Sequence, residues 1–136
     1  MIHYIDHTAD AGFEIDAPDL NSLFSQAGYA MLDMLYDRSA IIKKQSRKIE
    51  ITAAATDILL HDFIAELLQI SQHEYFLIST IDIIHIDDRS LHAKIEGEPI
   101  NPKVHSFLTE IKAVTYHQLT AEPRGNKWFA RIIFDI

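Results

Sequence analysis

The chain has 136 residues, a formal net charge of −8, 48% apolar residues and no cysteine. This length fits a single domain, 1–136, and the composition is typical of a globular protein with a sizeable core. The lack of cysteine excludes disulfides, thiolate catalysis and cysteine-bound zinc. The acidic balance argues against strong direct binding to nucleic acid, because contact with phosphates requires a basic surface.

The start of the chain has no basic stretch followed by an apolar run, so we expect no signal peptide. No window is apolar enough to predict a membrane span, and we expect no membrane partner. Together with the lack of cysteine, these features lead us to expect a cytoplasmic protein. An acidic chain of this kind is suited to a basic protein partner or to cations.

In chain order, the first expected elements are two short strands around a polar corner, within residues 2–17. The apolar residues Phe13, Ile15 and Ala17 alternate there with acidic residues. This period of two is typical of a strand with one buried face.

Two amphipathic helices are expected next, separated by a strand. The first begins after Asp19 and the second at Thr56, and both residue types are good N-caps. Each helix carries one apolar stripe that we expect to pack on a sheet. His61 and His73 of the second helix are interpreted as surface residues, because their separation does not match a pair of metal ligands.

The remaining strands are mostly arranged as hairpins. Residues 46–54 alternate in polarity, and 76–98 read as a long strand, a tight turn at 87–90 and a returning strand. After a loop at 99–107, a final hairpin turns at 124–126. Together these elements predict an α+β fold in which two helices pack on a mostly antiparallel sheet.

Conventional enzyme signatures are absent from the sequence. It contains no H-E-x-x-H, G-x-S-x-G, Walker A or G-x-G-x-x-G motif. His3 and His7 are four residues apart, but their segment is expected to be extended, so they would not share a helix face as zinc ligands do.

Carboxylates occur instead at two corners of the predicted fold. Asp6 and Asp10 lie near the start, and Asp135 precedes the main-chain carboxylate of Ile136. If the first and last strands are neighbours, these oxygens could meet in a site for a hard cation such as Ca²⁺ or Mg²⁺. Aspartates at strand ends also serve as turn-formers or solvated charges, so the spacing alone leaves both interpretations open.

Several stretches resemble the archease family. They are "DHTAD" near the start, "GEPINPKVH" and "EIKAVTYHQL" in the second half, and "DI" as the last two residues. They span the chain in the family's order. One position departs from the family's pattern: archeases have a lysine immediately before the histidine of the second stretch, whereas this chain has Val104 there and Lys103 one residue earlier.

The resemblance implies an SHS2-like fold and an accessory role in tRNA splicing. Archeases are not enzymes themselves. They promote guanylylation and multiple turnover of the RtcB-type RNA ligase, which seals tRNA exon halves, and they broaden its nucleotide use. The family's metal site carries over to Asp10, Asp135 and Ile136, with Ca²⁺ expected first and Mg²⁺ or Mn²⁺ as alternatives. On this reading the terminal carboxylate itself is a ligand.

The same resemblance suggests residues that contact the ligase or support the metal ligands: Asp6, His7, Lys103, Lys112 and His117. An alternative from another class is a small metal-dependent phosphoester hydrolase that uses the same carboxylates. That enzyme would need a general base, for which His7 and His117 are the candidates.

Overall fold

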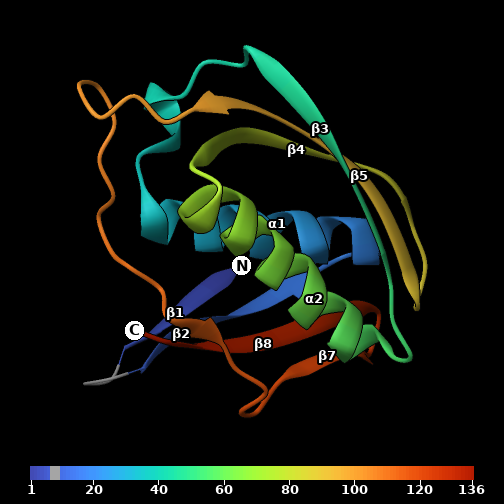
Figure 1. The fold of residues 1–136 in the computed structure, drawn as a ribbon. Coiled ribbons are helices and arrows are strands. Elements are labelled where there is room, and N and C mark those ends of the chain that lie inside the picture. The colour runs from blue at the N-terminus through green and yellow to red at the C-terminus, as the bar shows by residue number, and fades with distance from the viewer. Residues whose placement is uncertain (7–9) are drawn as a thin grey trace.

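The computed structural model describes residues 1–6 and 10–136, which form two antiparallel sheets with two α-helices between them (Figure 1). The five-stranded sheet contains β1 (Ile2–Asp6), β2 (Asp10–Ala17), β8 (Lys127–Asp135), β7 (Thr120–Arg124) and β6 (Ala113–Val114). The three-stranded sheet contains β3 (Gln45–Thr52), β5 (Ser90–Pro99) and β4 (Phe76–Ile86). The predicted α+β class is confirmed, with its strands divided between two sheets.

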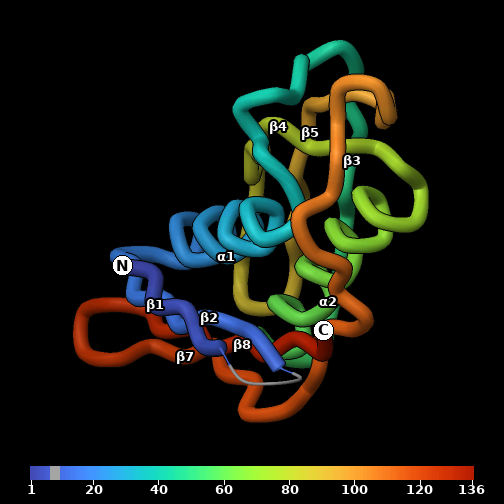
Figure 2. Tube along the Cα trace, turned by 90° about the vertical axis from the view of Figure 1, so that its left-hand side faces the viewer, coloured from blue at the N-terminus to red at the C-terminus, as the bar shows by residue number. Residues whose placement is uncertain are grey.

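The helices α1 (Leu20–Leu35) and α2 (Thr56–Leu68) fill the space between the sheets (Figure 2). Helix α1 contacts β4 on one side and β2 and β8 on the other, and α2 contacts β3, β6 and β7. Apolar side chains from both sheets and both helices therefore form one core, whose largest fully buried members include Phe13, Phe24, Phe63, Phe76 and Phe134.

The two expected helix starts have different outcomes. Asp19 is the N-cap of α1, and its carboxylate accepts the N–H of Ser22 at 2.7 Å, which confirms the prediction. The prediction for Thr56 is wrong, because Ala55 occupies the cap position and the Thr56 hydroxyl donates to the Asp88 carbonyl at 2.9 Å. Helix α2 ends at Leu68 and continues as one π-helical turn, Gln69–His73. None of the described helices is both long enough and apolar enough to cross a lipid bilayer.

Strand β8 is the central strand of the larger sheet. It pairs with β2 along one edge, and with β7 and then β6 along the other. The predicted final hairpin is confirmed as β7–β8, with Gly125 in the left-handed region at φ 64° in its turn. The third pairing, β6 with the end of β8, was not predicted, and it brings the 111–117 segment beside the last residues of β8.

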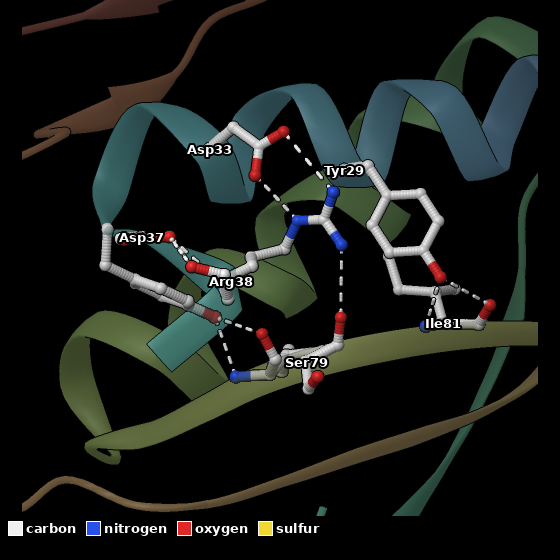
Figure 3. A network of polar contacts seen from close by, with 9 residues as sticks. Tyr29, Asp33, Asp37, Arg38, Ser79 and Ile81 are labelled. Carbon is white, nitrogen blue, oxygen red and sulfur yellow. Dashed lines mark hydrogen bonds and ion pairs between the residues drawn. The ribbon is translucent and has the colours of Figure 1, made fainter. Parts of the chain in front are cut away.

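The end of α1 is fixed to the edge of β4 by a polar network (Figure 3). Arg38 donates to Asp33 at 2.6 Å and to the Ser79 carbonyl at 3.2 Å, and its guanidinium lies 4.2 Å from the centroid of the Tyr29 ring. The Tyr29 hydroxyl accepts the N–H of Ile81 and donates to its carbonyl. These side chains therefore satisfy backbone groups of β4 along the edge that pairs with no described strand.

Tyr36 also bonds to backbone groups of β4, at a buried position. Its hydroxyl accepts the Ile78 N–H at 2.6 Å and donates to the Ile78 carbonyl at 2.9 Å. Burial raises the pKa of Tyr36 to about 12. Because the unfolded chain releases this proton near pH 10, the contribution to stability is complete below pH 10 and is lost as the pH rises toward 12.

We therefore predict that the free energy of unfolding falls by about 2–3 kcal/mol between pH 10 and pH 12 through Tyr36. Tyr36→Phe should lack this component and should already be destabilised by about 2 kcal/mol at pH 7, because Ile78 loses both of its partners. Urea unfolding at both pH values tests this, with the exposed Tyr75→Phe as the control. An unchanged alkaline loss in Tyr36→Phe would contradict it.

Candidate functional site

Two aspartates that are far apart in the sequence lie directly opposite each other at one end of the larger sheet. The register of β2 and β8 makes Asp10 and Asp135 Cα partners, and both are exposed. The neighbouring pair on the same face, Gly12 with Ile133, brings the two backbones close together. The ends of β2 and β8 therefore lie side by side, whereas β1, which carries Asp6, pairs with β2.

The alternation of β2 explains the direction of these side chains. Phe13 and Ile15 are buried against the helices, as are Ile132 and Phe134 of β8. Asp10 and Asp135 therefore lie on the opposite, outer face. Like charges directly opposite across two strands are destabilising, so this pair favours a bound cation or a basic partner.

The 111–117 segment forms one side of this corner. Ala113 of β6 is the Cα partner of Asp135, and the Lys112 N–H donates to the Asp135 carbonyl at 2.7 Å. Thr115 donates to the Ile133 carbonyl with its N–H at 3.0 Å and its hydroxyl at 2.9 Å. Lys112 is exposed, and its backbone is held at the end of β8 by this bond.

The other candidate residues do not all lie at the corner of Asp10 and Asp135. Asp6 is exposed at the end of β1, but it faces Ala11, so the pleat directs its side chain away from the face of Asp10. His117 is exposed, and its N–H donates to Thr115, so it lies near the corner. His7 lies outside the described residues. Lys103 is exposed in the loop after β5, and this loop runs from the smaller sheet toward the C-terminal end of the larger one (Figure 1).

The donor set at this corner is entirely oxygen. Within 1–6 and 10–136, no three side chains of histidine, aspartate or glutamate gather at metal-binding spacing. A cation here would be held by the carboxylates of Asp10 and Asp135, with main-chain oxygens, water or a partner completing the shell. Oxygen ligands of this kind fit Ca²⁺ or Mg²⁺. Ile136 is partly buried and packs against the core, which places its main-chain atoms at the same corner.

Sequence reasoning missed a buried polar pair at the base of the Lys103 loop. Glu98 accepts the Ile42 N–H at 2.6 Å, and this bond, with the charge of Lys44, holds the pKa of the Glu98 carboxyl below its usual range. His105 lies 3.4 Å from the same carboxylate, and its Nδ1 accepts the Asn101 N–H at 2.9 Å. This pair fixes the loop, and the only signal for it was the position of His105 in the second resembling stretch.

A second missed residue is His61. The expectation that it lies on the surface is wrong, because its side chain is buried beside the 111–117 segment. His73 is exposed, as expected.

The fold and the carboxylate corner define a class of small α+β domain. In this class the helices lie between two antiparallel sheets, and paired carboxylates are exposed at one end of a sheet. The Archease protein family (MTH1598/TM1083) matches residues 3–136. An archease of Methanosarcina acetivorans is 31% identical over 98% of this chain and 94% of its own length. One of Pyrococcus abyssi is 32% identical over 98% of this chain and 96% of its own length.

Solved structures agree with this assignment. The solution structure of Methanobacterium thermoautotrophicum protein 1598 is 33% identical and has a TM-score of 0.80, covering 99% of this chain and 98% of that one. The crystal structure of TM1083 from Thermotoga maritima, described as an archease and possible chaperone, shares the fold at a TM-score of 0.66 and 21% identity, over 97% and 94% of the two chains. This chain belongs to the archease family.

Proposed function

We propose that the chain is an accessory protein that activates an RtcB-type RNA ligase, and that it is not itself an enzyme. In this role it promotes guanylylation and multiple turnover of the ligase and broadens the ligase's nucleotide use. The observation that carries the proposal is the convergence of three separate stretches at one corner. Asp10, Lys112 and Asp135 meet there through the β2–β8 register and the bond between the Lys112 N–H and the Asp135 carbonyl.

The charges of the chain support a protein partner with a basic cleft. The net charge is −8, and the paired carboxylates are exposed at the end of a sheet. A ligase that binds RNA and a nucleoside triphosphate needs a positive active-site cleft, toward which an acidic surface is steered. Lys112 and His117 are exposed on the 111–117 segment that borders the end of β8, and Lys103 is exposed in the loop after β5, so all three are proposed as contacts of the ligase.

We further propose that Asp10 and Asp135 hold a divalent cation, with Ca²⁺ expected first and Mg²⁺ or Mn²⁺ as alternatives. The main-chain carboxylate of Ile136 is proposed as a third ligand. A bound cation would neutralise the repulsion between the two aspartates and supply a positive centre for oxygen ligands of the partner.

The test is a ligation assay with the purified chain and its cognate ligase on phosphate-ended RNA. We expect the chain to raise multiple-turnover ligation and the guanylylated fraction of the ligase, and to hydrolyse no phosphoester alone. Equal ligation rates with and without the chain, at matched nucleotide and Mn²⁺, would overturn the proposal. Phosphoester hydrolysis by the chain alone would favour the alternative enzyme class.

A further inference from the structure

His61 lies in α2 with both ring nitrogens engaged. Its Nε2 is 2.9 Å from the Val114 carbonyl oxygen, and its Nδ1 is 2.9 Å from a carboxylate oxygen of Asp62. Its ring stacks on that of Tyr116, with centroids 3.9 Å apart and planes 15° from parallel. The residue His61 is 8% exposed, whereas Tyr116 is 62% exposed. One buried side chain therefore connects α2 to the segment that borders Asp135.

Both partners of the ring are hydrogen-bond acceptors. A carbonyl oxygen can only accept, and an ionised carboxylate can only accept. Neutral imidazole carries one N–H, so one of its nitrogens would direct a lone pair at an oxygen lone pair. Only the imidazolium, with an N–H on each nitrogen, satisfies both contacts. Stacking on Tyr116 adds a favourable cation–π contact to the same form.

We propose that His61 is a positioning residue, held as an imidazolium between Asp62 and the Val114 carbonyl, that fixes the 111–117 segment against the end of β8. Val114 lies between the two residues that bond to β8, Lys112 through the Asp135 carbonyl and Thr115 through the Ile133 carbonyl. Loss of the hydrogen bond between His61 and the Val114 carbonyl is therefore expected to weaken both of these bonds. Its effect on the cation site rests on the proposed function of Asp10 and Asp135.

The surroundings of the ring are consistent with a single compensating charge. The titratable groups in contact with it are the Asp62 carboxylate on its own helix and the Tyr116 phenol. Helix α2 also packs on α1, β3 and β7. Within the described residues of those elements, none forms a hydrogen bond or ion pair with His61.

Two variants and one control test the proposal. His61→Gln keeps a donor for Val114 but removes the charge. Asp62→Asn replaces the acceptor with an amide that can donate to a neutral Nδ1, so it should preserve packing while removing the need for the imidazolium. The control is His73→Gln, which alters an exposed histidine beyond the end of α2.

The first measurement is the ¹⁵N NMR signature of the His61 ring in the wild type at pH 6, where we expect both nitrogens to be protonated. The second is the protection of the Lys112 and Thr115 amides from hydrogen exchange, corrected for intrinsic rates. At pH 6 we expect the protection of both amides to fall about 10-fold in His61→Gln relative to the wild type, because the charge-assisted bond to Val114 and the stacking on Tyr116 are lost. Asp62→Asn should keep most of this protection, and His73→Gln should keep all of it.

The outcomes separate this inference from the proposed function. A neutral His61 ring at pH 6, or amide protection that is unchanged in His61→Gln, would overturn it. Calcium titration at pH 6 gives a further readout, with binding expected to weaken roughly 3- to 10-fold in His61→Gln. If the wild type binds no Ca²⁺, the cation site fails, while the ring signature and the amide protection still decide the role of His61.

Discussion

Replacing Asp135 by asparagine is expected to weaken Ca²⁺ binding by on the order of 100-fold and to abolish activation of the ligase, and Asp10→Asn should do the same. Each change removes one of two carboxylates from a hard-cation site whose affinity depends on ligand charge. Both residues are exposed on the outer face, so neither supports the core. Without cation, both variants should be at least as stable as the wild type, because the repulsion across the strand pair is relieved.

The matched control is Asp16→Asn, since Asp16 is exposed on the same face of the same strand but lies opposite Phe129. Calorimetric titration measures the effect of each substitution on Ca²⁺ binding. Thermal unfolding with Ca²⁺ and with chelator measures its effect on stability, because a ligand stabilises only a chain that binds it. A marked loss of stability in chelator would make these aspartates structural.

Addition of Gly-Ser after Ile136 tests the proposed main-chain ligand, and unchanged Ca²⁺ affinity in that variant would exclude it.

Gly12→Ala is expected to lower the free energy of unfolding by roughly 3 kcal/mol or more. An added Cβ would lie 2.2 Å from the carbonyl oxygen of Ile132 and 3.1 Å from the Cα of Ile133. Both atoms belong to the backbone of β8, so no side-chain rotation can relieve the clash and β2 must move away from β8. The same displacement separates Asp10 from Asp135, so Ca²⁺ affinity should fall together with stability.

Gly125→Ala provides the comparison for that experiment. Its added Cβ meets no atom within 4 Å, and its cost arises only from the left-handed backbone at φ 64°. We expect a loss of about 1 kcal/mol there, with Ca²⁺ affinity unchanged. Equal unfolding midpoints for the two variants would show that the close approach of β2 and β8 is not the constraint.

Residue patterns predicted the elements around the carboxylate corner well. The alternation that buries Phe13 and Ile15 also determines that Asp10 lies on the outer face, because a strand has only two faces. Asp19 was recognised as a cap because its interaction is local, with a backbone N–H three residues later. The corresponding prediction for Thr56 failed because its hydroxyl bonds instead to the carbonyl of Asp88, which lies 32 positions away in the chain.

The failures concern contacts between elements. His61 was interpreted as a surface residue because its separation from His73 does not match a pair of metal ligands, an argument that considers no contact with another element. Helix α2 packs between two sheets, which buries His61. Lys103 was named as a candidate contact on the resemblance alone, and that assignment stays a prediction; its loop follows β5 of the smaller sheet. The two-residue strand β6 has too short a pattern to be recognised at all.

The position of β8 has a consequence for how the chain reaches its native state. An ion pair at 2.7 Å joins Arg131 of β8 to Glu14 of β2, residues that are 117 positions apart in the chain. Ribosomes release residues in order, so β1 and β2 leave the exit tunnel long before the strand that will cover their inner edge. Such distant pairing slows folding, and until β8 arrives β2 presents an unsatisfied edge to other chains. Nascent chains that stall before β8 should therefore be substrates for chaperones, and the carboxylate corner cannot form during synthesis until the larger sheet closes.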